Sequence, residues 1–318
     1  MTHTSVARGS KSIVLAVHGG AGVIPRPQMT SGAEHGYEAG IAAALQTGHA
    51  VLARGGSSVD AVVAAVSAFE DDPHFNAGRG AAFTADGVNE LDAAVMDGAT
   101  LNAGAVTLVT TVKNPVQLAR LVMDKTRHVL LAGHGAEALA RRFGLETAGA
   151  EYFYTERRWN ALQRMRAASA DADIALTEAD RHGTVGAVAL DADGNLAAAT
   201  STGGRNNKLG GRVGDTPIVG AGTYANNITA AVSCTGEGEF FMRILAAHTV
   251  SALMEFKGWS VEQSAQHVIH ERLGGAGGRG GLIALDRNGH VAMPFSTPGM
   301  YRGVIRANGE PTVSIFAD

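Results

Sequence analysis

At residues 182–191 the chain reads HGTVGAVALD, so that a glycine and a threonine stand directly before a short apolar run. The small and branched apolar residues that follow Thr184 predict a buried β-strand. Upstream, residues 166–182 read RAASADADIALTEADRH, which is small, polar and acidic with little periodicity. Such a composition predicts a mobile linker. The junction between these two segments therefore places a threonine at the start of a strand, directly after Gly183.

This placement suits a threonine that becomes a chain terminus. A threonine hydroxyl is a weak nucleophile unless a base lies beside it, and the α-amine of an N-terminal threonine is such a base. The pKa of an α-amine, about 7.7–8.0, is close to neutral, whereas a lysine amine near 10.4 needs strong desolvation. Exposing the amine of Thr184 requires cleavage of the Gly183–Thr184 bond. The local pattern alone favours a plainer interpretation, a loop followed by a buried strand that begins with threonine.

Predicted strands and helices lie on both sides of this junction. Short apolar runs predict strands at residues 13–17, 90–96, 103–112, 196–200, 230–233, 282–285 and 291–293. Helical spacing of apolar residues predicts helices at residues 37–52, 58–69, 240–256 and 261–273, and another that begins near Pro115. Because sheets and helices must bury their apolar faces against each other, we expect a sheet-on-sheet core with helices outside.

The composition excludes several classes of function. The chain has 318 residues and a formal net charge of −4, so we expect no nucleic-acid partner, which would need a broad basic surface. Cys234 is the only cysteine, so an intrachain disulfide cannot form and a reducing cytoplasm fits. The apolar run at 13–17 is shorter than the roughly 7–15 residues of a signal-peptide core. No run approaches the ~18 apolar residues of a membrane span, so we expect no membrane partner.

Further motifs follow one another in a fixed order. They are HGGAG at 18–22, FNAGRG at 75–80, ELDAAVMDG at 90–98, TSTGG at 200–204, GRVGDTP at 211–217 and CTGEGE at 234–239. Together with GTVGAVALD at 183–191, they make nearly the whole chain resemble the plant-type asparaginase, or isoaspartyl peptidase, family of N-terminal-nucleophile hydrolases. Several motifs in order are far more specific than any one of them, and they outweigh the plainer interpretation of the junction.

The resemblance implies an α+β fold, a four-layer αββα sandwich of the N-terminal-nucleophile hydrolase type. Residues 1–318 would form one domain, cleaved into an α subunit at 1–183 and a β subunit at 184–318. Relatives assemble as dimers of the processed pair, which implies an (αβ)2 assembly. The resemblance implies no cofactor for the chemistry.

The resemblance also implies a role for each residue of a catalytic site. Thr184 would be the nucleophile both for self-cleavage and for turnover, with Thr202 hydrogen-bonded beside it. Arg212 would clamp the α-carboxylate of the substrate, a task that suits a planar bidentate donor. Asp215 would pair with the α-ammonium of the substrate.

Four more residues are implied around the reacting atoms. The hydroxyl of Thr235 and the backbone N–H of Gly236 would form an oxyanion hole, in which one donor is typically worth about 2.7–4 kcal/mol. Gly238 would let the backbone approach the substrate. Asn76 matches a family asparagine near the nucleophile.

A loop with a structural ion is implied as well. In relatives the segment that matches residues 69–79 binds sodium through backbone carbonyls. The corresponding residues here are Phe69, Glu70, Asp72, Phe75, Ala77 and Arg79. The side chains of Glu70 and Asp72 need not touch the ion.

The implied reaction follows from the charges of the clamp. One cation and one anion hold the α-groups of an aspartyl unit, so its side-chain carbonyl meets Thr184 and a β-aspartyl bond is cleaved. The substrates would be L-asparagine and β-aspartyl (isoaspartyl) dipeptides, with L-aspartate as product. Glu237 adds a negative charge near the leaving group and is expected to influence which peptides are accepted.

Two alternatives stay open at this point. The first is a glycosylasparaginase, which shares the nucleophile and the clamp but acts on glycan-linked asparagine and would be expected to carry a signal peptide and disulfides. The second is a non-catalytic module that holds an anionic small molecule in its glycine loops.

Overall fold

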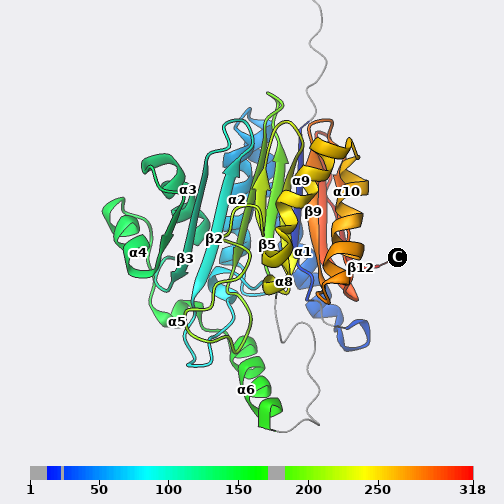
Figure 1. The fold of residues 1–318 in the computed structure, drawn as a ribbon. Helices are drawn as coiled ribbons and strands as arrows, with labels where there is room; N and C mark the ends of the chain where they lie inside the picture. The colour runs from blue at the N-terminus through cyan, green and yellow to red at the C-terminus, as the bar shows by residue number, and fades with distance from the viewer. Residues whose placement is uncertain (1–12, 23–24, 171–182, 318) are drawn as a thin grey trace, which may run out of the picture.

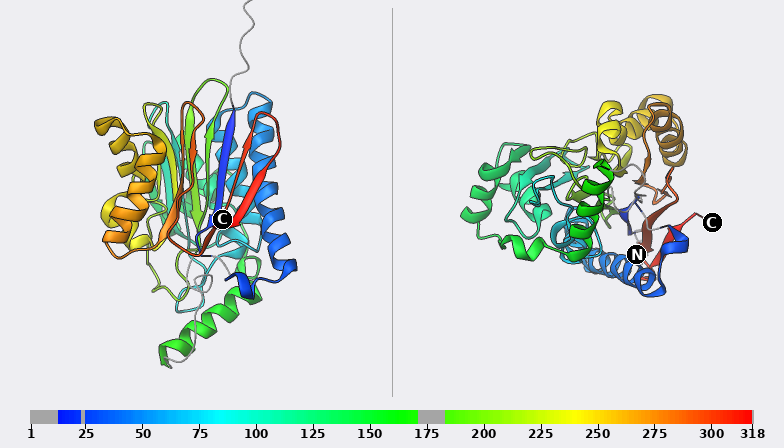
Figure 2. Two further views of the ribbon diagram at one scale, coloured as in Figure 1. Left: turned by 90° about the vertical axis from the view of Figure 1, so that its right-hand side faces the viewer. Right: turned by 90° about the horizontal axis from the view of Figure 1, so that it is seen from below.

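Two β-sheets stack face to face between two layers of helices (Figure 1). The structure is a computed structural model that describes residues 13–22, 25–170 and 183–317. Seen from below in Figure 2, the blue helix near the N-terminus and the gold helices near the C-terminus lie on opposite sides of the strands. This arrangement confirms the predicted α+β fold with four αββα layers.

The larger sheet carries residues Val185–Leu190 of the HGTVGAVALD segment near its centre. Its strands, in spatial order, are β12 (Thr312–Phe316), β11 (Gly299–Arg306), β1 (Val14–Gly20), β5 (Val185–Leu190), β6 (Leu196–Thr202), β2 (Leu91–Asp97), β3 (Ala103–Val109) and β4 (Leu130–Ala132). All neighbours are antiparallel except β3 and β4, which are parallel. Strand β5 therefore lies between β1 and β6, which carry the HGGAG and TSTGG motifs at their ends.

The smaller sheet packs against the centre of the larger one. Its strands, in spatial order, are β10 (Val291–Ala292), β9 (Gly280–Asp286), β8 (Ala230–Gly236) and β7 (Thr223–Ala225). Strand β8, which ends in the CTG of the CTGEGE motif, contacts both β5 and β6. The side chain of Cys234 on β8 is buried in the apolar cluster on the helix side of this sheet, away from the other sheet.

Helices cover the outer faces of both sheets. On the larger sheet these are α1 (Ser31–Ala53), α2 (Ser58–Asp71), α3 (Pro115–Lys125) and α4 (Gly133–Arg142). On the smaller sheet they are α8 (Gly238–Ile244), α9 (Ala246–Lys257), α10 (Val261–His267) and the π-helix η3 (Val268–Leu273). The remaining helices are α5 (Ala150–Phe153), α6 (Glu156–Ala170) and the 3-10 turns η1 (Arg26–Gln28) and η2 (Gly78–Gly80). Within the described ranges, no helix is both long and apolar enough to cross a bilayer.

The alternation of side chains along β5 decides what Thr184 faces. Val185 and Ala187 pack in the cluster beneath α1 and α2, whereas Val188 and Leu190 pack between the two sheets. Because successive side chains of a strand point to opposite faces, Thr184 faces the layer between the sheets.

The predicted helix at 240–256 is wrong, because the structure has two helices with a break at Leu245. That residue adopts a left-handed conformation with φ of 48°. The break lets the N–H groups of Ala247 and His248 donate to the carbonyls of Ala221 and Gly220, at 3.1 and 2.8 Å. A tertiary hydrogen bond thus overrides the local helical pattern.

The predicted linker and the predicted strand at 103–112 also differ from the structure. Residues 166–170, assigned to the linker, belong to α6, and residues 171–182 of the predicted linker lie outside the described residues. The strand predicted at 103–112 ends in the structure at Val109. Leu108 adopts a φ of 56°, and its N–H donates to the carboxylate of Asp92 instead of continuing the strand pattern.

Candidate active site

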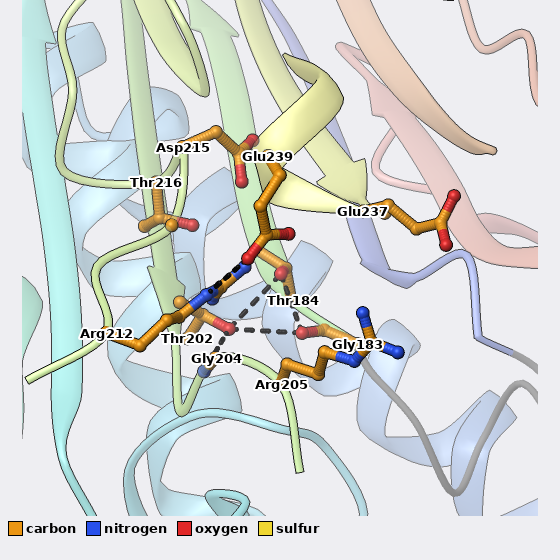
Figure 3. A pocket seen from close by; sticks show the side chains of 12 residues that line it. Gly183, Thr184, Thr202, Gly204, Arg205, Arg212, Asp215, Thr216, Glu237 and Glu239 are labelled. Atoms are coloured by element: carbon orange, nitrogen blue, oxygen red, sulfur yellow. Dashed lines mark hydrogen bonds and ion pairs between the residues drawn. The ribbon is translucent and has the colours of Figure 1, made fainter. Parts of the chain in front are cut away.

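Thr184 and Thr202 face each other at the ends of two neighbouring strands. Thr184 precedes β5 and Thr202 ends β6, and the register that pairs Val185 with Ser201 brings the two threonines side by side. Their hydroxyl oxygens are 3.2 Å apart, and both side chains are buried (Figure 3). The predicted nucleophile and its neighbour are therefore brought together by the hairpin.

The carbonyl oxygen of Gly183 accepts hydrogen bonds from three side chains. The hydroxyl of Thr184 donates to it at 2.6 Å, the hydroxyl of Thr202 at 3.1 Å and the amide of Asn76 at 2.9 Å. The Asn76 amide group also donates to the Gly204 carbonyl at 2.7 Å, which fixes its orientation. Donors placed in this way polarise the carbonyl of the bond that precedes Thr184 and can stabilise an oxyanion there.

A pocket opens beside Thr184 and brings most of the predicted site residues together. Its lining comprises Gly183, Thr184, Thr202, Gly204, Arg205, Arg212, Gly214, Asp215, Thr216, Gly236, Glu237 and Glu239. Arg212 donates from Nε to the carboxylate of Glu239 at 2.9 Å. This bond leaves the two terminal guanidinium nitrogens of Arg212 for a ligand, which is the fork that suits a carboxylate.

Asp215 is a buried carboxylate with an unused acceptor. Its Oδ2 atom has no hydrogen-bond partner among the described residues. Burial raises the pKa of Asp215 to about 7, although the positive charge of Arg212 opposes the shift. A ligand ammonium would supply the missing partner and favour the ionised form. The pair of Arg212 and Asp215 therefore offers one cation and one anion to a zwitterion.

Glycines let the backbone approach this pair closely. A Cβ atom on Gly238 would lie 2.7 Å from Oδ1 of Asp215 and 3.0 Å from a guanidinium nitrogen of Arg212. Gly236 adopts a φ of 148°, and a Cβ there would lie 2.5 Å from the carbonyl oxygen of Arg279. Any side chain at either position would displace these neighbours.

Thr235 lies beside the pocket rather than in its lining. Its side chain is fully buried, and its hydroxyl accepts a hydrogen bond from the N–H of Ala21 in the HGGAG loop at 3.2 Å. Because this bond uses a lone pair, the hydroxyl proton of Thr235 is still available to a ligand.

Comparisons with known proteins match nearly the whole chain. The profile of the Asparaginase family matches residues 11–315. An isoaspartyl peptidase of Escherichia coli (strain K12) is 50% identical over 309 residues, which cover 96% of each chain. An isoaspartyl peptidase/L-asparaginase of Danio rerio is 45% identical over 287 residues, which cover 89% of each chain. A probable isoaspartyl peptidase/L-asparaginase 2 of Arabidopsis thaliana is 40% identical over 326 residues, covering 95% of this chain and 98% of the other.

The chain belongs to the asparaginase family. Its motifs and its relatives agree over nearly the whole length, which confirms the resemblance seen in the sequence.

Within this asparaginase fold, His18 of the HGGAG motif connects Thr184 to the second sheet. Its Nδ1 atom lies 3.1 Å from the Thr184 carbonyl oxygen, and its Nε2 atom lies 2.9 Å from the hydroxyl of Ser233 on β8. Burial lowers the pKa of His18 to about 3, so the ring is neutral and donates from Nδ1 to the carbonyl. A Cβ atom on Gly186 would overlap the Ser233 hydroxyl, which explains the second glycine of GTVG.

The hydrogen bonds continue from Ser233 to the loop that carries Asp215. The hydroxyls of Ser233 and Thr200 are 2.7 Å apart, and that of Thr223 donates to Thr200 at 2.7 Å. The Thr223 hydroxyl also lies 3.1 Å from the carbonyl of Thr216, the residue after Asp215. These side chains are all buried between the sheets, so they connect Thr184 to the loop of Asp215 through one hydrogen-bonded frame.

Three charged residues that interact with the charge of Arg212 were given no role by the sequence analysis, and they are Glu239, Lys208 and Asp92. Glu239 orients Arg212, as described above. Lys208 donates to the backbone carbonyl of Glu90 at 2.8 Å, and its buried ammonium is attracted by the carboxylate of Asp92. Burial lowers the pKa of Lys208, and Asp92 opposes the shift. Asp92 and Glu239 belong to the ELDAAVMDG and CTGEGE motifs, but no single motif contains both members of a pair, because the partners come from β2, the loop after β6 and α8.

The acidic side chains of the predicted sodium loop are engaged elsewhere. Glu70 accepts hydrogen bonds from Val116 N at 3.0 Å and from Ser201 Oγ at 2.6 Å, and burial raises its pKa to about 8. Asp72 accepts from the N–H of His74 at 2.9 Å. In the part of the chain that the structure describes, no three His, Cys, Asp or Glu residues are grouped to hold a metal ion. Any ion in this loop would therefore depend on backbone carbonyls.

Proposed function

We propose that this protein is a self-processing amidohydrolase that cleaves isoaspartyl dipeptides and L-asparagine, with Thr184 as an N-terminal nucleophile. The observation that carries the proposal is the buried carboxylate of Asp215, which has an unused acceptor and lies with Arg212 in the pocket beside Thr184. The relatives named isoaspartyl peptidase and L-asparaginase support the same activity.

Self-cleavage begins when the Thr184 hydroxyl attacks the carbonyl carbon of Gly183. The Oγ–C bond forms, the C–N bond of the peptide breaks, and the hydroxyl proton passes to the freed amine. The donors from Asn76 and Thr202 stabilise the charge that develops on the Gly183 oxygen. Water then hydrolyses the ester, which leaves a carboxylate on Gly183 and a free hydroxyl and α-amine on Thr184.

Turnover uses the same hydroxyl, now with the α-amine of Thr184 as its base. Arg212 binds the α-carboxylate of the aspartyl unit and Asp215 binds its α-ammonium, so the side-chain carbonyl meets Thr184. Attack gives an acyl-enzyme and releases ammonia or an amino acid. Thr235 and Gly236 stabilise the tetrahedral intermediate, and water releases L-aspartate.

A denaturing gel and an activity assay test this proposal together. The wild type is expected to give two fragments, residues 1–183 and 184–318, and to release aspartate from β-aspartyl-leucine. Thr184→Ala should give one full-length band and no turnover. A wild type that stays intact, or a Thr184→Ala variant that is still cleaved, would contradict the mechanism.

The sodium loop, the assembly and the compartment belong to the same proposal. Na⁺ would be held by the carbonyls of Phe69, Glu70, Asp72, Phe75, Ala77 and Arg79, neutral ligands that suit a singly charged ion. The ion would stiffen the loop that carries Asn76. Processed pairs would form (αβ)2 in the cytoplasm. We expect the protein to melt at a lower temperature in choline chloride than in NaCl. We also expect light scattering to give the mass of two processed pairs.

A further inference from the structure

Arg205 is a second arginine in the lining of the active-site pocket, and it differs from Arg212 in its partners. The Arg212 guanidinium is held by the carboxylate of Glu239 at 2.9 Å. The Arg205 side chain forms no hydrogen bond or ion pair with any residue that the structure describes. Arg205 is therefore a cation in the pocket whose hydrogen-bond donors are unused.

The backbone beneath Arg205 is fixed by the catalytic residues. The N–H of the preceding Gly204 donates to the Thr202 hydroxyl at 2.9 Å, and the Gly204 carbonyl accepts from the Asn76 amide at 2.7 Å. In the view of Figure 3, the guanidinium groups of Arg205 and Arg212 lie on opposite sides of Thr184. The pocket thus presents one cation on each side of the nucleophile.

The neighbouring carboxylates are already engaged. Glu237 lines the same pocket, but its Oε2 atom accepts the backbone N–H of Arg279 at 3.0 Å. Glu239 is bonded to Arg212; burial alone would raise the pKa of Glu239, but Arg212 lowers it, and the more weakly interacting Arg205 adds a smaller effect in the same direction. Neither carboxylate therefore forms a direct pair with Arg205.

The two proposed substrates differ in one charge. L-Asparagine has a single carboxylate, which Arg212 binds. An isoaspartyl dipeptide has a second carboxylate, at the C-terminus of the amino acid that leaves. A guanidinium with unused donors is the side chain best matched to a carboxylate.

We propose that Arg205 binds the C-terminal carboxylate of the leaving amino acid, so that the pocket selects isoaspartyl dipeptides over asparagine. This inference rests on the proposed function. Arg205 would act on the leaving side of the scissile bond, while Arg212 and Asp215 hold the aspartyl side. Because the contact is present only in substrates with a free C-terminus, it acts mainly through KM.

The test compares three substrates on fully processed enzyme: β-aspartyl-leucine, the same dipeptide with a C-terminal amide, and L-asparagine. For the wild type we expect kcat/KM to be about tenfold higher on the free acid than on the amide. Arg205→Gln should bring this ratio close to one by raising KM on the acid, and Arg205→Lys should keep part of the preference. Arg141→Gln, which removes the same charge from an exposed site on α4, should keep the wild-type ratio.

The wild type also supplies a test that needs no variant. Because an ion pair to the half-buried Arg205 is still partly screened by salt, raising NaCl from about 50 to 500 mM should lower the acid-to-amide ratio. Equal kcat/KM on acid and amide, or an unchanged ratio in Arg205→Gln, would overturn the role of Arg205 and leave the proposed function standing. A processed wild type that hydrolyses none of the three substrates would overturn the proposed function itself.

Discussion

Two sets of polar side chains lie near Thr184, one between the sheets and one in the pocket, and they differ in whether their hydrogen bonds are complete. In the frame formed by His18, Ser233, Thr200 and Thr223, each side chain has a partner. In the clamp, the Oδ2 atom of Asp215 has none among the described residues. A satisfied buried group stabilises the fold, whereas an unsatisfied one costs free energy that a ligand can recover.

An unsatisfied atom alone does not mark a site. One carboxylate oxygen of Glu70, Oε2, and one of Asp92, Oδ2, also lack partners among the described residues. Neither residue lines the pocket. What distinguishes Asp215 is its position beside Arg212 and Thr184. The frame and the clamp should therefore respond in opposite ways to substitution, activity being lost at the clamp and stability at the frame.

The largest effect is expected at the clamp. Asp215→Asn removes the negative charge that pairs with the substrate ammonium, and kcat/KM on β-aspartyl-leucine should fall at least about 100-fold. The melting temperature should not fall, because the substitution also removes a buried carboxylate with an unused acceptor. Enzyme kinetics and calorimetry on the same preparation measure both. If Asp215→Asn loses stability and keeps its activity, Asp215 belongs to the structural frame and not to the clamp.

At the frame, the effect is expected on stability. His18→Ala removes the side-chain partner of the Thr184 carbonyl and one of the two partners of the Ser233 hydroxyl, and should cost about 2–4 kcal/mol of unfolding free energy. Urea unfolding is measured in the Thr184→Ala background, where one covalent chain unfolds. The matched control is His290→Ala, because the His290 side chain is 72% exposed. If both histidine variants unfold at the same urea concentration, the frame has no structural role.

The smallest effect is expected from pH. The pKa of Asp215 is raised to about 7 by burial, and only the carboxylate binds an ammonium, so affinity for L-aspartate should fall up to about tenfold per unit below pH 7. Binding of the product is measured instead of turnover, because turnover would also depend on the ionisation of the Thr184 amine. His18, with a pKa of about 3, stays neutral throughout this range. Calorimetric titration between pH 5.5 and 8 checks the slope, and a constant affinity would contradict it.

The same ionisation has a consequence for stability, with the opposite sign. The folded-state pKa of Asp215 is raised above the usual value of 3.8 for an aspartate, so its contribution to stability is present at low pH and is lost as the pH rises through about 7. Glu70, whose pKa is raised to about 8, contributes in the same direction. The difference in unfolding free energy between wild type and Asp215→Asn isolates the share of Asp215.

Local sequence patterns predicted those strands and helices whose conformation depends on neighbouring residues. The alternation after Thr184 predicted a buried strand, and the structure has β5 at Val185–Leu190. The same logic failed where a distant group intervened. At Leu245 the helical pattern continues, but carbonyls of the turn before β7 capture the N–H groups of the next turn.

The sequence by itself determined the family, the sandwich and the threonine junction, because ordered motifs and strand periodicity are properties of neighbouring residues. Only the tertiary structure joined His18 to Ser233, which is 215 positions away, Glu239 to Arg212, and Lys208 to Glu90. It also decided that Arg205 has no direct partner among the described residues while Arg212 has one. The physical reason is that burial and hydrogen bonding depend on which strands and loops meet in space, and antiparallel pairing brings together residues that are far apart in the chain.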